Sequence, residues 1–324
     1  PEVAGFDLLN EPETSRPASE LSAAYNDLLG DVIRSIRAAQ AGAPFDTIVI
    51  VEPAIPSADV SRGLMIPDPA AAGVSTENVA AGVHNYAESI DGGLGLTIEG
   101  TNRLIAGITA DLGIPNWGGE YGWWDTSAAS LAEARRYAVD EDRYAWGGAW
   151  WQWRQSCGDP HHVQWSGGTV VAPADVSTHL NKLQCPDNTE LGQTDEFLDI
   201  LGRGYPRATP GTIDELRSDP ATGYLKVKAT VGVAGGELVV WTPTTADPEH
   251  QVNVHGLTDV VEHEVEGGRI ITARVGAPGT YALWIGEPDE DLTATTTTGT
   301  LPSDSPAPEP PSAVPVAGDA GYTG

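Results

Sequence analysis

Two glutamates, Glu11 and Glu120, stand where strand-like runs end, which is where a parallel sheet places its functional side chains. Glu11 lies in Asn10-Glu11-Pro12, and Glu120 is flanked by glycine and tyrosine rather than by helix-surface charges. Two adjacent carboxyl groups can cleave a glycosidic bond: one protonates the leaving oxygen, and the other attacks the anomeric carbon or activates water. Burial and mutual repulsion would raise the pKa of the acid. The alternative is that both are surface carboxylates among 46 acidic residues.

Histidine, tyrosine and tryptophan side chains occupy other predicted strand ends. His84 and Tyr86 close one strand, and Trp150, Trp151 and Trp153 lie in and after the last one. Because side chains alternate between the two faces of a strand, Trp151 and Trp153 share one face. Trp150 then points to the opposite face, where we expect it to pack in the core. A structural histidine is the alternative interpretation of His84.

A pair of adjacent histidines, His161 and His162, is a weak sign of metal binding. Two neighbouring residues on a regular element cannot both face one ion, and no further ligand is obvious. We therefore expect a loop-structuring role for this pair, and we expect no metal and no cofactor.

Strand-like and helix-like patterns alternate over residues 1 to 204, which predicts an α/β fold with a parallel sheet. The β-branched run at 47–51 is typical of a buried parallel strand. We expect strands at 3–9, 47–51, 79–86, up to 120 and 145–153, and helices at 19–41, 97–112, 127–140 and 194–201. A long loop is expected between the last strand and the last helix.

The pattern changes after residue 204. Closely spaced strand-like runs between about 224 and 286, separated by glycine-containing turns, predict a small antiparallel β-sandwich. The segment from 287 to 324 is rich in Pro and Thr and contains no Lys or Arg, so we expect a disordered tail. The predicted domains are therefore 1–204, 205–286 and 287–324.

Charge excludes some functions. With 46 Asp and Glu against 17 Lys and Arg, the 324-residue chain has a formal net charge of −29 and repels nucleic acid. Its apolar runs are too short to span a bilayer. Cys157 and Cys185 are interpreted as a disulfide if the protein is secreted, or as unrelated thiols if it is cytosolic. The acidic, Thr/Pro-rich tail favours a secreted or cell-surface protein.

Four motifs in order resemble glycoside hydrolase family 5. GFDLLNEP at 5–12 is similar to the fourth-strand motif of that family, and GGEYG at 118–122 resembles its seventh-strand nucleophile motif. HNY at 84–86 is similar to the sixth-strand His-x-Tyr pattern, and GGAWWQW at 147–153 resembles the eighth strand.

The resemblance implies a TIM barrel and a retaining double displacement that needs no metal. Glu11 would be the acid/base and Glu120 the nucleophile. The other implied roles are sugar 2-hydroxyl binding by Asn10, orientation of neighbouring groups by His84, a hydrogen bond from Tyr86 to the nucleophile, and stacking of Trp151 under the sugar.

The downstream segments YPRATPGT at 205–212 and DPATGY at 219–224, followed by a β domain, resemble the endoglycoceramidases. Those enzymes cleave the β-glucosidic bond between a glycan and ceramide. Within the same family, an endo-β-1,4-glucanase or another β-glucosidase stays open as an alternative. A carbohydrate-binding protein without catalysis is the alternative from another class.

A TIM barrel needs eight strand–helix units and about 250 residues. This chain supplies strands that match only the fourth to the eighth, so we expect a partial barrel and an N-terminally truncated fragment that is poorly folded and inactive alone. The expected partner is a glycolipid or β-glucan substrate, met by a monomer outside the cell or at its surface. Association with a membrane would occur through the substrate.

Overall fold

The structure is a computed structural model. It describes residues 3–12, 18–43, 46–54, 65–89, 96–123, 125–153, 164–166, 169–171, 175–176, 180–184, 187–243 and 251–286. The predicted Cys157–Cys185 disulfide, the His161-His162 pair and the predicted tail from 287 to 324 lie outside these residues.

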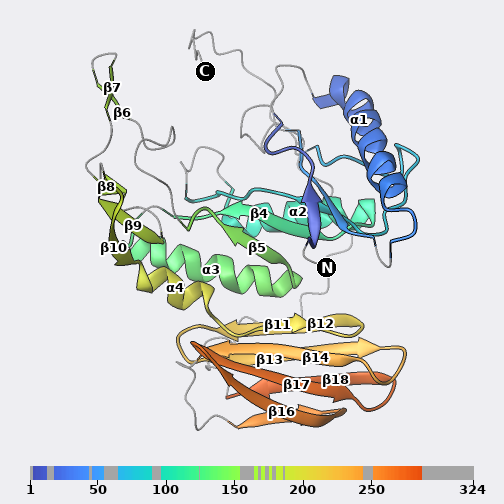
Figure 1. The fold of residues 1–324 in the computed structure, drawn as a ribbon, viewed down its shortest axis with the longest axis vertical. Coiled ribbons are helices and arrows are strands. Elements are labelled where there is room, and N and C mark those ends of the chain that lie inside the picture. Colours follow the sequence, from blue (N-terminus) through green and yellow to red (C-terminus); the bar gives the residue numbers. More distant parts are fainter. Residues whose placement is uncertain are drawn as a thin grey trace. The chain divides into compact units, whose positions relative to one another are not determined.

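Five parallel strands form the first sheet, in the order in which they follow one another along the chain (Figure 1). They are β1 (Gly5–Asp7), β2 (Ile48–Val51), β3 (Val79–Gly82), β4 (Asn116–Tyr121) and β5 (Gly147–Trp150). Every one lies within a predicted strand or overlaps it. All five carboxyl ends meet at one edge of the sheet, where the candidate site residues follow.

Helices follow β1, β3 and β4 along the chain, a fourth helix comes later, and the helices pack on the sheet. They are α1 (Ala18–Ala39), α2 (Ile98–Leu112), α3 (Ala128–Tyr144) and α4 (Asp195–Leu201). Side-chain caps fix two of the starts, because the hydroxyl of Thr97 accepts from the N–H of Gly100 and that of Ser127 from the N–H of Ser130. Helix α3 runs four residues further than predicted, as far as Tyr144.

Two clusters form the hydrophobic core beneath this sheet. In the first, Leu29 and Ile33 of α1 and Ile105 of α2 pack against Val49 and other apolar residues of the sheet. The second contains aromatic side chains of β4 and α3 together with α4. The helices therefore cover the sheet on its apolar face.

Short strands occupy the segment that the sequence predicted to be a long loop. They are β6 (Gln164–Ser166), β7 (Thr169–Val171), β8 (Asp175–Val176), β9 (Asn181–Gln184) and β10 (Thr189–Gln193). The loop prediction is wrong here. These strands are only two to five residues long, and β10 is exposed along its whole length, so no apolar alternation marks it.

Two four-stranded antiparallel sheets follow, in the orders β11-β14-β17-β16 and β12-β13-β18-β15. Their strands are β11 (Tyr205–Ala208), β12 (Thr212–Asp219), β13 (Tyr224–Val231), β14 (Glu237–Pro243), β15 (Val252–His255), β16 (Leu257–Val265), β17 (Gly268–Val275) and β18 (Gly279–Ile285). Alternate residues of both sheets form one buried cluster that includes Leu225, Leu238, Ile271 and Leu283. Strands β11 and β12 were not predicted, because both consist largely of polar and half-exposed residues.

The parallel half-barrel followed by antiparallel sheets confirms the predicted fold class. Buried ion pairs join Arg203 to Glu141 and Asp142 of α3, and Ser218 of β12 donates to Asp142. The domain boundary at 204 stays a prediction.

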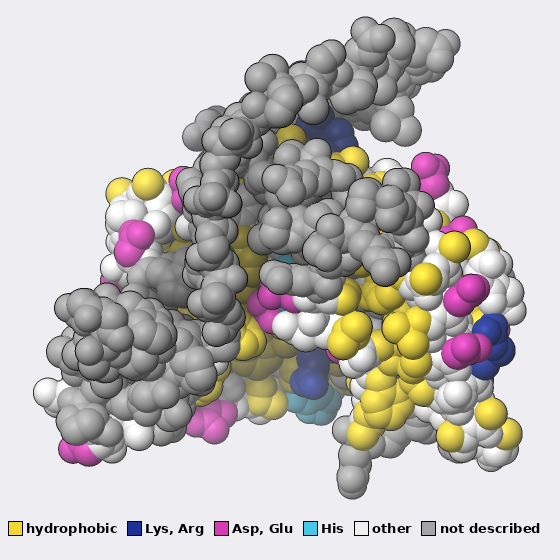
Figure 2. All heavy atoms as spheres, turned by 90° about the horizontal axis from the view of Figure 1, so that it is seen from above, with side chains coloured by type: hydrophobic (Ala, Val, Ile, Leu, Met, Phe, Trp, Pro, Cys, Tyr) yellow, Lys and Arg dark blue, Asp and Glu magenta, His cyan; other side chains and the backbone are white. Residues whose placement is uncertain are grey.

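None of the described helices is both long and apolar enough to cross a membrane. On the face shown in Figure 2, acidic side chains are more frequent than basic ones, in keeping with the net charge.

Candidate active site

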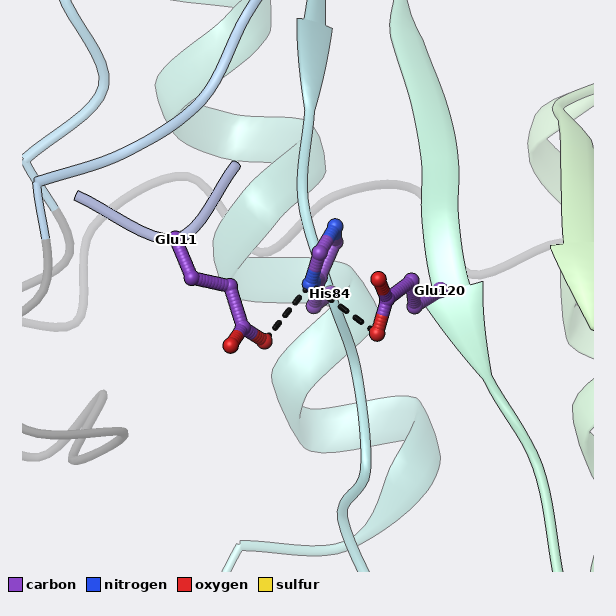
Figure 3. A group of neighbouring side chains, drawn as sticks. All are labelled: Glu11, His84 and Glu120. Atoms are coloured by element: carbon purple, nitrogen blue, oxygen red, sulfur yellow. Dashed lines mark hydrogen bonds and ion pairs between the residues drawn. The ribbon is translucent and has the colours of Figure 1, made fainter. Parts of the chain in front are cut away.

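Glu11, His84 and Glu120 meet at the carboxyl edge of the parallel sheet (Figure 3). Glu11 follows β1, His84 follows β3, and Glu120 lies in β4. Nδ1 of His84 is 2.8 Å from Oε1 of Glu11 and 3.5 Å from Oε2 of Glu120. One oxygen of each carboxyl group and the ring nitrogen all lie within 4.8 Å of one another. The imidazole thus stands between the two carboxyl groups.

Tyr86 holds the other side of Glu120. Its hydroxyl donates to Oε2 of Glu120 over 2.9 Å, which is the hydrogen bond that the resemblance implies. The main chain is fixed as well, because the N–H of Asn85 donates to the carbonyl oxygen of Glu120 over 3.0 Å. Asn85 is itself buried and donates to the amide oxygen of Asn102 on α2. The segment that carries His84 and Tyr86 is therefore tied to β4 and to α2.

Opposing influences act on the Glu120 carboxyl group. Burial is the largest, and it raises the pKa of Glu120 above its usual value. The charge of His84 and the hydroxyl of Tyr86 favour the carboxylate, whereas Glu11 and Glu52 oppose it. A buried carboxylate with a cation and a donor directed at it has the environment of a nucleophile.

Two further carboxyl groups, those of Glu52 and Asp7, lie behind this triad. The side chain of Glu52 is only 2% exposed, so it is a buried carboxyl group rather than one at the rim of a pocket. Oε1 of Glu52 lies 3.2 Å from Nε2 of His84. Asp7, in β1, shares a hydrogen bond with Glu52. The sequence signal for Glu52 was its position directly after β2; for Asp7 it was the motif that also contains Glu11.

The electrostatics of this cluster keep His84 protonated. Burial, the largest influence, opposes the cation, but the hydrogen bond to Glu11, the close contact with Glu52 and the charges of Glu52 and Glu120 outweigh it and raise the pKa of His84 to about 10. Burial, followed by the charge and hydrogen bond of Glu52, raises the pKa of Asp7 to about 6. At neutral pH the cluster therefore contains a histidinium in contact with the carboxyl groups of Glu11, Glu52 and Glu120.

The same three atoms of Glu11, His84 and Glu120 are close enough together to surround a metal ion. A metal ligand must be a deprotonated imidazole nitrogen. Because the pKa of His84 is raised to about 10, both ring nitrogens carry protons at neutral pH. A metal ion at this position would therefore have to displace a proton from Nδ1 of His84.

Tryptophans of the last parallel strand separate as the alternation predicts. Trp150 packs against Tyr121, Trp123 and Phe197 with ring centroids 4.8 to 5.8 Å apart, which confirms its core position. Trp151 is half-buried, and its N–H donates to the carbonyl oxygen of Tyr121 over 2.8 Å. It thus follows β5 at the same edge of the sheet as the triad, and it precedes a cis peptide bond.

Backbone conformation distinguishes the acid motif. Asn10 is exposed beside Glu11, and Glu11 has a φ of 43°, in the left-handed region that residues other than glycine seldom adopt. The main-chain N–H of Glu11 donates to Oε2 of the buried Glu52 over 2.5 Å. A charged hydrogen bond therefore holds the residue that needs this unusual conformation.

No protein-family model matches the chain, and no curated protein matches it. Several solved structures, however, match the chain in fold. A crystal structure of an endogalactoceramidase is 26% identical with a TM-score of 0.68, over 88% of this chain and 58% of that one. Endo-glycoceramidase II from Rhodococcus sp., as a lactosyl-enzyme intermediate, is 22% identical with a TM-score of 0.60, over 89% and 59%. The same enzyme with ganglioside GM3 is 21% identical, with a TM-score of 0.59, over 88% and 59%.

These structural neighbours define the class of fold as that of a glycoside hydrolase. The chain spans 58% of the length of the endogalactoceramidase and 59% of that of endo-glycoceramidase II. The likeness is to endoglycoceramidase structures in particular and, at 21 to 26% identity, it shows the fold.

Proposed function

We propose that this chain carries the catalytic pair of a retaining β-glycosidase that cleaves the β-glucosidic bond between a glycan and ceramide. The observation that carries the proposal is the approach of Glu11 and Glu120, whose nearest ligand oxygens lie within 4.8 Å across His84. Retaining glycosidases hold their carboxyl groups about 5 Å apart, whereas inverting ones leave roughly 6.5 to 9.5 Å for a water molecule. The spacing therefore supports the retaining mechanism.

The chemistry proceeds in two displacements. Glu120 attacks the anomeric carbon while Glu11 donates a proton to the departing ceramide oxygen, which leaves a glycosyl ester on Glu120. Glu11, now a carboxylate, removes a proton from water as the water attacks the same carbon, and Glu120 leaves as a carboxylate. In the resting enzyme, before the first displacement and after the second, Tyr86 and the His84 cation stabilise the carboxylate of Glu120.

The substrate class is the finer part of the proposal. The solved neighbours are an endogalactoceramidase and an endo-glycoceramidase II, the latter as a lactosyl-enzyme intermediate and as a complex with ganglioside GM3, and all of these concern glycolipids or their glycans. We assign Asn10 to the 2-hydroxyl of the sugar and Trp151 to stacking under the ring. Both follow parallel strands at the edge where the two glutamates lie.

The setting is proposed along with the substrate. We place the enzyme outside the cell or at its surface, as a monomer that meets membranes through its lipid substrate. The acidic excess and the Thr/Pro-rich segment after residue 287 support an extracellular location. Fractionation of the producing cells and sedimentation of the purified protein test the location and the monomer; intracellular retention or a stable dimer would contradict them.

The first experiment traps the intermediate. The chain is incubated with 2-deoxy-2-fluoro-β-lactosyl fluoride, whose fluorine slows breakdown of the glycosyl ester, and its intact mass is measured. We expect a mass gain of one fluorolactosyl group on the wild type and none on Glu120→Gln. Glu99→Gln, which changes a surface glutamate paired with Arg136, is the matched control and should label fully. A chain that releases sugar from a β-lactoside and yet stays unlabelled would contradict the assignment.

The second experiment separates the substrates. Lactosylceramide and cellohexaose are supplied in parallel, and the released sugars are followed. Free lactose with intact cellohexaose supports the ceramide-directed function. Cleaved cellohexaose with intact lipid keeps the two glutamate roles but moves the substrate to β-glucans. Binding of either without release, in a folded chain, favours a carbohydrate-binding protein.

A further inference from the structure

Glu52 is a fully buried carboxyl group that contacts the proposed acid/base residue, Glu11, directly and also contacts it through His84. Its Oε2 accepts the main-chain N–H of Glu11 over 2.5 Å, and its Oε1 lies 3.2 Å from Nε2 of His84. The opposite ring nitrogen, Nδ1, lies 2.8 Å from Oε1 of Glu11. Glu52, His84 and Glu11 therefore contact one another in a ring. The carboxyl group of Glu52 binds the main chain of Glu11 and also contacts the imidazole that binds the Glu11 side chain.

Burial makes the Glu52–His84 contact important. Oε1 of Glu52 receives no hydrogen bond of ordinary geometry from the described residues, so the ion pair with His84 is its main compensation on that side. The side chains of Glu52 and His84 are 2% and 4% exposed. An unpaired charge at such a site would cost several kcal/mol. The carboxyl group of Glu52 therefore favours a proton on Nε2 of His84.

We propose that Glu52 is a positioning residue that keeps one proton on Nε2 of His84, so that the other ring proton, on Nδ1, can move to Glu11 and back during catalysis. This inference rests on the proposed function, since it says how the Glu11 carboxylate regains the proton that it needs to act as an acid. Glu52 itself does not touch the substrate, because it is buried behind the histidine.

The step balances in atoms and charge. The Nδ1–H bond of the imidazolium breaks as an O–H bond forms on Oε1 of Glu11, which leaves neutral His84 with its proton on Nε2 facing Glu52. Glu11 then gives that proton to the leaving oxygen. In the second displacement Glu11 takes a proton from water and returns it to Nδ1. Without Glu52, neutral His84 could keep its proton on Nδ1 instead, where it would block donation by Glu11.

Every charged or titratable group that faces His84 or Glu52 among the described residues fits this arrangement. Glu11 and Glu120 face Nδ1, and Glu52 faces Nε2. Asp7 shares a hydrogen bond with Glu52 from β1, and the phenol of Tyr25, on α1, donates to the Glu52 carbonyl oxygen. Tyr86 donates to Glu120. The pKa of His84, about 10, is in keeping with this excess of carboxyl groups.

Nitrogen NMR of the ring tests the inference directly. The full chain is produced with ¹⁵N-histidine, and the His84 signals are identified by their loss in His84→Gln. In the wild type we expect both ring nitrogens to be protonated at neutral pH, and Nε2 alone to be protonated once His84 becomes neutral. In Glu52→Gln we expect the midpoint to fall by more than one pH unit and Nδ1 to become the protonated nitrogen. Glu99→Gln should match the wild type.

Two results would overturn the inference. One is a neutral wild-type His84 that carries its proton on Nδ1, a measurement that needs no folded variant. The other is a Glu52→Gln chain with the wild-type midpoint and tautomer. In an active chain, Glu52→Gln should also move the alkaline limb of kcat/KM to lower pH with little change in KM.

Failure of the inference and failure of the proposed function give different results. If the fluorosugar does not label Glu120, the glycosidase assignment fails, whatever the tautomer of His84. If the sugar labels Glu120 but the tautomer does not depend on Glu52, the glycosidase stands and the role of Glu52 falls.

Discussion

The backbone of Gly119 lies so close to His84 that no side chain fits between them. A Cβ at position 119 would be 2.9 Å from both Cδ2 and Nε2 of the ring. The ring cannot simply turn aside, because Glu11 and Glu52 hold its two nitrogens and its side chain is 4% exposed. The glycine before Glu120 is thus a steric requirement of the cluster.

Replacing Gly119 with alanine should displace His84 and weaken catalysis. Overpacking of this kind costs about 1 to 3 kcal/mol of stability, and a displacement of about 1 Å near the chemistry can reduce the rate roughly 100-fold. Urea unfolding and kcat/KM check both effects. The matched control is Gly107→Ala in α2, where a Cβ meets nothing within 4 Å and alanine suits the helix better than glycine. Equal activity of the two variants would contradict the steric argument.

Removing the phenol hydroxyl with Tyr86→Phe should raise the pKa of Glu120, because the hydrogen bond favours its carboxylate. A hydrogen bond to a charged group contributes about 1.5 to 3 kcal/mol, which corresponds to roughly one to two pH units. The acid limb of kcat/KM should therefore move to higher pH. Tyr281→Phe is the control: it removes a hydrogen bond to the carbonyl oxygen of Pro210, in the β-sandwich, and should lower stability without moving the profile.

His84 should make stability depend on pH in a defined window. Its folded pKa of about 10 lies above the unfolded value of 6.5, so its contribution is fully present below pH 6.5 and is lost as the pH rises through 10. The difference in free energy of unfolding between the wild type and His84→Gln should shrink across that window. A difference that stays constant from pH 6 to 10 would show that the charge of His84 does not stabilise the fold.

Asp7 gives a second window, at lower pH. Its folded pKa of about 6 lies above the usual 3.8, so the stabilising protonated form is complete below pH 3.8 and is lost as the pH rises through 6. Asp7→Asn should therefore match the wild type near pH 4 and exceed it in stability at pH 7. Denaturant titrations at the two pH values measure this. An Asp7→Asn chain that is less stable than the wild type at both would contradict the shared proton.

Periodicity predicted the parallel strands and their helices, because buried strands such as β2 are continuous β-branched runs and α2 has an apolar face. It also predicted that Glu11, His84, Tyr86 and Glu120 lie at one edge of the sheet, since parallel strands share their carboxyl edge. Strands β10 and β12 were missed because they lack a clean alternation of exposed and buried residues.

Burial of charge was the other feature that local sequence could not give. In the sequence Glu52 is one carboxylate among many until the fold places it against His84, and Arg203, just after the short helix α4, has no acidic partner in its local sequence that marks it as buried. Whether a charge is buried depends on residues far along the chain. The partners of Arg203 are about sixty residues earlier, on the C-terminal part of α3.

Arg203→Met should destabilise the chain strongly. The guanidinium pairs with Glu141 over 2.7 Å and with Asp142 over 3.0 Å, and all three side chains are at most 9% exposed. Burial raises the pKa of both carboxyl groups, and Arg203 opposes that rise. Without the cation, two buried carboxylates would be left together, at a cost of about 3 to 5 kcal/mol. Asp142 also accepts from Ser218 of β12, so the loss should reach the β-sandwich.

The pH dependence of this loss distinguishes charge from packing. In Arg203→Met the folded state should bind protons more tightly than the unfolded chain, so the deficit in free energy of unfolding should be larger at pH 8 than at pH 5. Arg34→Met is the control, because Arg34 and its partner Asp31 are 49% and 77% exposed and such pairs contribute about 0 to 1 kcal/mol. If the loss of stability in Arg203→Met is the same at both pH values, then the packing of the Arg203 methylene groups, rather than the guanidinium charge, stabilises the fold.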